Sequence, residues 1–220
     1  MGMSLQLFAQ IPKVPSNIEF AGMDLHLNKS AQKKIQEDVN KLCKNPTYFQ
    51  KYVDQADIYF PLIEKVFAEE KFPDEIKYLV IQESAFRSEA VSSSNAVGYW
   101  QFKKATGLEV GLRIKGRIDE RKNIERASRG AAIYMTKNNS KLDNWIHALT
   151  SYNTGLGGVQ RYVDKKDIGA QKMDITARTH WYFLKFLAHK IAFQNAIGKK
   201  KPSISLLVDK NQGGKKLKEI

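Results

Sequence analysis

The stretch FPDEIKYLVIQES, residues 72–84, is the part of the sequence that most clearly decides the fold. Pro73 and the two acidic residues after it form a typical helix start, because proline fits the first helical position and carboxylates favour the positive end of a helix. Apolar residues then recur three and four positions apart, which predicts one buried helix face. The stretch therefore predicts a short amphipathic helix.

Glu83 extends the apolar face of this predicted helix. Ile76, Leu79, Val80 and Glu83 are spaced as i, i+3, i+4 and i+7, so all four share one side. One interpretation is a residue at the edge of the buried stripe, exposed or paired with a cation. The other is a general acid, because burial disfavours a carboxylate and lets the side chain keep its proton near neutral pH. Cleavage of a glycosidic bond requires such a proton donor.

The rest of the chain also favours helices. An N-cap at Ser30 precedes Ile35, Val39 and Leu42 at helical spacing. No convincing run of alternating strand residues is present, so the predicted fold is mainly α. The other expected helical segments are a region from Tyr48 that restarts at Pro61, and residues 101–106, 125–137, 143–152 and 175–196.

Composition fits a folded protein with an anionic partner. The 220 residues are 42% hydrophobic and 27% charged, and the net charge is +13. This composition excludes a wholly disordered chain. The charge suggests nucleic acid, acidic lipid or an acidic polymer of the cell envelope. No nucleic-acid-binding motif is present, so we expect no nucleic-acid partner and read the charge as attraction to an anionic envelope.

Cysteine and histidine give no sign of a metal site or a disulfide framework. Cys43 is the one cysteine, and the four histidines are scattered without metal-ligand spacing. We therefore expect no metal and no other cofactor. The most apolar segment, residues 175–197, is interrupted by several basic residues and is not expected to span a bilayer.

Three regions are expected along the chain. Residues 1–29 form an extended lead-in, whose start is either a remnant of a signal peptide or a cloning remnant. Residues 30–197 form the folded domain. Residues 198–220 hold seven Lys and only two acidic residues, and form a basic tail. The end of the tail faintly resembles the opening of a LysM glycan-binding repeat, which predicts that the natural protein continues.

Several short motifs follow Glu83 in a fixed order. They are ESAF at residues 83–86, AVS at 90–92, AVGYWQF at 96–102 and ALTSYNTG at 148–155. The ordered set resembles the soluble lytic transglycosylase (SLT) domain family, a goose-lysozyme-like catalytic module. The segment DERKN, residues 119–123, is similar to the branch of the family represented by membrane-bound lytic murein transglycosylase D. The resemblance covers roughly residues 60–196.

The resemblance implies a mainly α, lysozyme-like SLT domain with a catalytic cleft and little or no β structure. It implies an enzyme that cleaves the β-1,4 bond between N-acetylmuramic acid and N-acetylglucosamine in peptidoglycan. In this family one Glu protonates the glycosidic oxygen, and the muramic acid 6-hydroxyl then closes a 1,6-anhydro ring, so the enzyme is a lyase. A goose-type hydrolase and a non-catalytic peptidoglycan-binding module remain the alternatives.

The resemblance also implies roles for individual residues. Glu83 matches the catalytic acid/base. Tyr152 and Asn153 match the family's Tyr-Asn pair, which implies substrate-binding roles for both. The match places the Tyr152 hydroxyl near Glu83; the alternative for Tyr152 is a core tyrosine. Gln101 either binds acetamido or hydroxyl groups or braces its own loop, and Ser92 either lines the cleft or is an ordinary loop hydroxyl.

The chain departs from the family pattern at two positions. Asn95 stands where the family usually has Gly, and Asn tolerates a positive φ better than other non-Gly residues. Tyr99 replaces a commoner Leu, which puts the subsite preference in doubt. The resemblance implies a monomer in the bacterial periplasm or cell envelope, acting on peptidoglycan strands, with membrane association left open.

Overall fold

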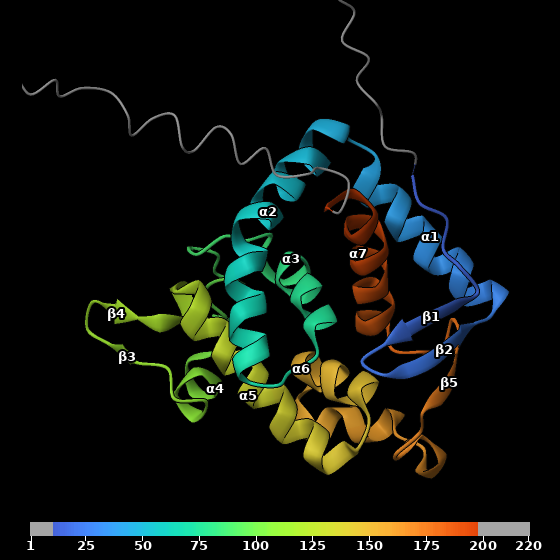
Figure 1. The fold of residues 1–220 in the computed structure, drawn as a ribbon. Helices are drawn as coiled ribbons and strands as arrows, with labels where there is room; N and C mark the ends of the chain where they lie inside the picture. Colours follow the sequence, from blue (N-terminus) through green and yellow to red (C-terminus); the bar gives the residue numbers. More distant parts are fainter. Residues whose placement is uncertain (1–10, 198–220) are drawn as a thin grey trace, which may run out of the picture.

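The computed structural model describes residues 11–197, and Figure 1 shows helices surrounding a central helix, α7, with a small sheet at one side. Elements marked η are short 3-10 helices. In chain order the elements are β1 Asn17–Phe20, β2 Met23–Leu27, α1 Lys29–Cys43, α2 Pro46–Glu69, η1 Asp74–Tyr78, α3 Leu79–Ser84, α4 Lys104–Glu109, β3 Ile114–Lys115, β4 Ile118–Asp119, η2 Glu120–Lys122, α5 Ile124–Leu142, α6 Trp145–Val159, η3 Gln160–Tyr162, η4 Lys165–Asp167, β5 Lys172–Ile175 and α7 Trp181–Ile197. The mainly helical class predicted from the sequence is confirmed.

Helix α7 is the centre of the core. It contacts α1, α2, α3 and α6, and from Tyr182 to Phe193 every residue except Lys185 is buried. A helix that is apolar on nearly all sides must be covered on nearly all sides, which explains why four other helices pack against it. The fold therefore fixes the position of α7 relative to α3, the helix that carries Glu83.

The predicted lead-in turns out to be part of the core. Strands β1 and β2 form an antiparallel hairpin, and β5 pairs in parallel with β2, so the sheet order is β1-β2-β5. Met23, Leu25 and Leu27 alternate with exposed residues along β2 and point inward. This alternation in a five-residue strand is too short to separate from an irregular segment by sequence alone. Residues 1–10 and 198–220, which include the predicted signal remnant and basic tail, lie outside the described residues.

Several helix boundaries differ from those predicted. Helix α1 is capped by Asn28, whose side chain accepts a hydrogen bond from the Ala31 amide, and not by Ser30. Helix α2 runs from Pro46 through Pro61 without a break. The predicted helix 175–196 begins only at Trp181, because Ile175 ends strand β5. Helix α6 continues past residue 152 and is kinked at Gly155, where φ is +72°.

The segment between α3 and α4 contains an unusual number of non-glycine residues with positive φ. Ala85, Phe86, Asn95 and Gln101 have φ between 49° and 59°. Such conformations cost free energy in an L-residue and persist only where the surrounding structure enforces them. The left-handed conformation expected to be tolerated at Asn95 is therefore present, and the loop that follows Glu83 is held in a defined shape.

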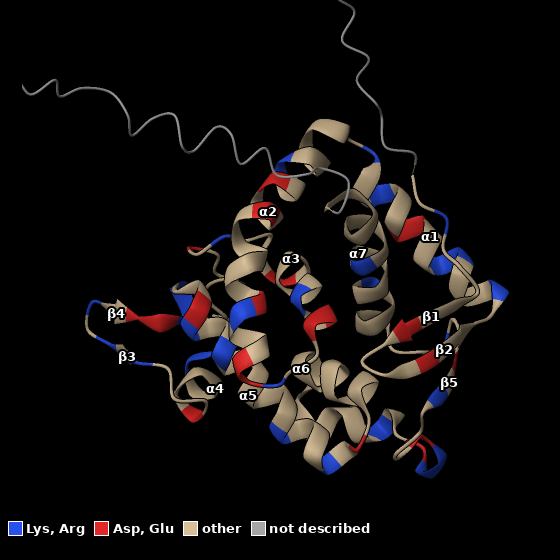
Figure 2. Ribbon diagram, viewed as in Figure 1, with Lys and Arg blue, Asp and Glu red and all other residues tan. Residues whose placement is uncertain are grey.

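Charged residues are spread over the molecule. Figure 2 shows Lys and Arg on most helices and around β5, interleaved with Asp and Glu. Several cations form ion pairs between elements, such as Arg129 of α5 with Glu69 of α2, and Lys77 of η1 with Glu64 of α2 at 2.5 Å. The positive net charge is accordingly not gathered into one stripe in this view.

Replacing Gly98 should disrupt the loop after α3. A Cβ at this position would lie 2.0 Å from the Arg121 carbonyl oxygen, and φ is +83°. We expect Gly98→Ala to lower the free energy of unfolding by at least about 3 kcal/mol, measured by urea denaturation. Gly111→Ala is the matched control, because its φ is +84° but no neighbouring atom lies within 4 Å of the place its Cβ would occupy. Its cost should be only about 1–2 kcal/mol, and equal losses in the two variants would contradict the close approach.

Candidate active site

Glu83 lies at the end of α3, against the first turns of α7. Ile76 of the 3-10 helix η1 and Leu79 and Val80 of α3 are fully buried, whereas Glu83 keeps partial access to solvent. The hydroxyl of the buried Tyr182 donates a hydrogen bond of 2.5 Å to Oε1 of Glu83. The predicted stripe therefore ends in a carboxyl group that is largely enclosed but still partly accessible to solvent.

The surroundings of Glu83 favour its protonated form. Burial raises the pKa of Glu83 from 4.5 to about 7, and this effect outweighs the Tyr182 hydrogen bond and the nearby Lys185 charge, both of which lower the pKa. A carboxyl group with a pKa near 7 holds its proton in about half of the molecules at neutral pH. Because Tyr182 donates to Oε1, the acidic proton is left to Oε2.

Tyr182 was not among the residues that the sequence predicted for the site. The resemblance placed the Tyr152 hydroxyl near Glu83, and the negative charge of Glu83 does raise the pKa of Tyr152, after burial as the larger cause. The Tyr152 hydroxyl, however, donates to the Trp100 carbonyl oxygen at 2.7 Å, so the hydrogen bond to the acid comes from Tyr182. A tyrosine at the start of a strongly apolar helix was the available signal, since a buried phenol needs a polar partner.

Three motif side chains hold three successive backbone carbonyl groups. Gln101 donates to the carbonyl of residue 98 at 2.9 Å, Ser84 to that of residue 99 at 2.7 Å, and Tyr152 to that of residue 100. Gln101 also donates to the Ala90 carbonyl at 3.1 Å. The amide nitrogen of Gln101 thus braces the loop, which is the second of the two interpretations that the sequence left open. These hydrogen bonds fix the loop that follows Glu83.

The other two predicted site residues differ in their contacts. Ser92 accepts a hydrogen bond from the Ala96 amide at 3.1 Å and lies 3.2 Å from the Ser94 hydroxyl, so it stabilises its own turn. Asn153 is exposed, and its side chain forms no hydrogen bond with any residue of the described range 11–197. Of the two, Asn153 has the side chain that is free to contact a ligand.

Asp119 and Glu120 form ion pairs with arginine side chains. Asp119 accepts hydrogen bonds from Arg121 at 2.7 and 2.8 Å, and this partner lowers the Asp119 pKa. Hydrogen bonds from Arg113 lower the pKa of Glu120. Both carboxylates are therefore stable anions in ion pairs, in contrast to Glu83. This arrangement agrees with a structural role for both.

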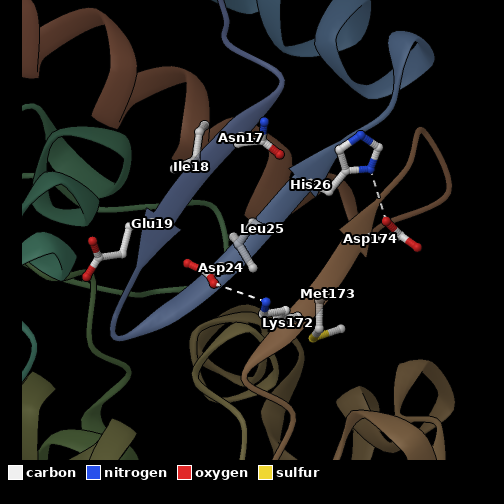
Figure 3. A pocket seen from close by; sticks show the side chains of 9 residues that line it. All are labelled: Asn17, Ile18, Glu19, Asp24, Leu25, His26, Lys172, Met173 and Asp174. Carbon is white, nitrogen blue, oxygen red and sulfur yellow. Dashed lines mark hydrogen bonds and ion pairs between the residues drawn. The ribbon is translucent and has the colours of Figure 1, made fainter.

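A hollow of about 590 Å³ lies on the small sheet and not at Glu83 (Figure 3). Four of the side chains that line it form two pairs: His26 lies 3.1 Å from Asp174, and Lys172 lies 3.9 Å from Asp24, while the exposed Glu19 lines it outside these pairs. None of the predicted site residues lines it.

Within residues 11–197 no three His, Cys, Asp or Glu side chains group in a way that would hold a metal ion. The same range contains no helix that is long and apolar enough to cross a membrane.

Comparison with known proteins identifies the domain. The family model of the transglycosylase SLT domain matches residues 62–175, slightly more than half of the chain. The chain belongs to this family. Membrane-bound lytic murein transglycosylase D of Escherichia coli strain K12 and its namesake from E. coli O6:H1 strain CFT073 are each 27% identical to the chain over 183 residues. The matches cover 80% of this chain but 40% of each relative, so this SLT chain spans two fifths of the length of the curated relatives it matches.

The burial of Glu83 should make this SLT domain less stable as the pH rises. The pKa of Glu83 is about 7 in the folded state and near 4.5 in the unfolded state, so the folded state binds more protons between these values. Stability is therefore lost as the pH rises through that window, by up to about 3 kcal/mol. We expect Glu83→Gln to be increasingly more stable than the parent from pH 4.5 to 7, with a constant difference above that.

Denaturation midpoints measured across the pH range test this expectation. Glu89→Gln is the control, because Glu89 is an exposed carboxylate that pairs with Lys122 at the surface. Its effect should stay within about 0.5 kcal/mol at every pH. A pH-independent difference between Glu83→Gln and the parent would show that Glu83 is not a buried acid.

Proposed function

We propose that this chain is a peptidoglycan lytic transglycosylase with Glu83 as its single acid/base. The observation that carries the proposal is a carboxyl group with its pKa near 7, held by Tyr182 through one oxygen and partly accessible to solvent. Membership of the SLT family supports the choice of substrate. We also propose that the protein acts in the bacterial cell envelope, where this polymer lies.

The first half of the reaction needs a proton donor. Protonated Glu83 donates from Oε2 to the glycosidic oxygen between N-acetylmuramic acid and N-acetylglucosamine. The bond from muramic acid C1 to that oxygen breaks, and the N-acetylglucosamine chain leaves with a free 4-hydroxyl group. The substrate's own acetamido oxygen stabilises the positive charge at C1, as in other substrate-assisted glycoside cleavages. No second enzyme carboxylate is needed, which fits the ion-paired state of Asp119 and Glu120.

The second half returns the proton. The Glu83 carboxylate accepts the proton of the muramic acid 6-hydroxyl, and that oxygen attacks C1 to close the 1,6-anhydro ring. Glu83 ends as it began, protonated, and no water is consumed. The Tyr182 hydrogen bond is stronger to the carboxylate than to the neutral acid, so it stabilises the form of Glu83 that exists between the two steps.

Removing the acid should abolish turnover without unfolding the domain. We expect Glu83→Gln to lower the rate of glycan cleavage by about 10³-fold or more, since a general acid typically contributes 10²–10⁴-fold. Mass spectrometry of digested peptidoglycan should show 1,6-anhydro-muramic ends for the parent protein. Reducing ends would point instead to a goose-type hydrolase, and full activity of Glu83→Gln would refute both assignments. If the parent protein bound glycan but released no product, the chain would be a non-catalytic peptidoglycan-binding module.

Tyr182 should set both the rate and its pH dependence. Cleavage needs protonated Glu83, so kcat/KM should fall above pH about 7. Tyr182→Phe removes a hydrogen bond that lowers the Glu83 pKa, so the fall in kcat/KM on the alkaline side, the alkaline limb, should move to higher pH. The maximal rate should fall about 10- to 100-fold.

Tyr152→Phe is the comparison variant, because its hydroxyl bonds to the Trp100 carbonyl and not to the acid. It should lower activity by loosening the loop but leave the alkaline limb in place. A shift of the limb in Tyr152→Phe and none in Tyr182→Phe would contradict the assignment of Tyr182.

A further inference from the structure

The otherwise buried stretch of α7 from Trp181 to Phe193 has one exposed side, which lies beside the candidate active site. Among residues 181–193 only Trp181 and Lys185 are exposed, and they stand four positions apart, on the same side of the helix. Tyr182, the residue after Trp181, donates its hydroxyl to Glu83, and the charge of Lys185 lowers the Glu83 pKa, so this part of α7 lies next to the acid. Trp181 is 52% exposed although tryptophan is highly buried on average.

Trp181 belongs to a continuous row of rings. Its ring centroid lies 5.6 Å from that of Tyr182 and 5.6 Å from that of His180, and the His180 ring lies 4.7 Å from that of Tyr162. We call Tyr162, His180 and Trp181 the aromatic strip. The strip is joined through Tyr182 to Glu83, so it begins at the candidate active site and leads away from it.

The strip is held in place by backbone hydrogen bonds. His180 precedes α7, and its carbonyl accepts the amides of Phe183 and Leu184 at 3.1 and 3.3 Å. Its Nδ1 accepts the Tyr182 amide at 3.3 Å, so the ring acts as the N-cap of the helix. Because Nδ1 is an acceptor, the neutral His180 ring carries its hydrogen on Nε2. Burial lowers the pKa of His180, which favours this neutral form.

The strip exposes apolar ring surface with polar groups at its edges. Tyr162, from η3, is 49% exposed, so the strip has a half-open ring at each end and a hydrogen-bond donor between them. A pyranose ring has apolar C–H faces and a polar rim of hydroxyl and acetamido groups, and it fits such a surface. Lys185 adds a cation beside the strip, which suits the carboxylates of muramic acid and of stem peptides.

We infer that the aromatic strip is a glycan-binding subsite that receives sugar rings of the same peptidoglycan strand whose bond lies at Glu83. The inference rests on the proposed function and adds to it a place where the strand is held beyond the cleaved linkage. Sugar rings stack on the indole of Trp181 and on the ring of Tyr162, and His180 Nε2–H donates to a hydroxyl or acetamido oxygen. The strip favours a glycan occupant because it is continuous with the pair of Glu83 and Tyr182.

Binding to soluble, peptide-free peptidoglycan strands of defined length tests the inference. In the Glu83→Gln background, where no cleavage is expected, Trp181→Ala should weaken binding of long strands roughly tenfold, an effect typical of losing one aromatic contact. Binding of a disaccharide should change by less than about twofold. Trp181→Phe should recover most of the affinity, and Tyr162→Ala should weaken long-strand binding to a similar extent.

Tyr48→Ala is the matched control, because Tyr48 is 61% exposed on α2 and has no ring contact with the strip. Unchanged affinity in Trp181→Ala, with a parent protein that still cleaves peptidoglycan, would overturn the subsite and leave the proposed function intact. A parent protein that never cleaves, but loses strand binding in Trp181→Ala, would keep the subsite and remove the enzyme. If Trp181→Ala lost binding to anionic lipid vesicles but bound glycan strands as the parent does, the subsite would be overturned in favour of a membrane contact.

Discussion

The docking of α7 against α3 is the contact on which the candidate site depends. It covers one side of Glu83, and it brings the Tyr182 hydroxyl to 2.5 Å from the carboxyl group. Burial alone would favour a neutral but unoriented acid, and a hydrogen bond alone would favour the anion. The two effects together give a carboxyl group that keeps its proton near neutral pH and presents a defined oxygen.

The residues that make up the family motifs mostly serve this arrangement indirectly. Ser84, Gln101 and Tyr152 hold the carbonyl groups of residues 98–100, and through them the shape of the loop after Glu83. That loop contains residues in the left-handed conformation, and these hydrogen bonds offset the conformational free energy that it costs. A motif can therefore be diagnostic of a fold because it builds the frame of the site, while few of its side chains are free to contact a ligand.

The chain's own surface adds features that the motifs do not contain. Trp181 and Lys185 form the one exposed face in the buried part of α7, and the row of rings from Tyr162 meets it. The pairing of β5 with β2 ends at Ile175, and the hydrogen bonds that His180 accepts mark the start of α7 at Trp181. The proposed glycan subsite and the tyrosine that binds Glu83 thus lie on neighbouring parts of one helix.

Sequence by itself determined the helical class, the position of Glu83 on an apolar helix face and the order of the motifs, because these follow from local spacing and residue type. It did not determine the hairpin at residues 17–27, the start of α7 at Trp181 or the partner of Glu83. Tyr182 lies 99 positions from Glu83, and no local pattern records which of several tyrosines will meet a distant carboxyl group. Only the tertiary packing decided that contact, since it depends on how α7 is enclosed by helices from the rest of the chain.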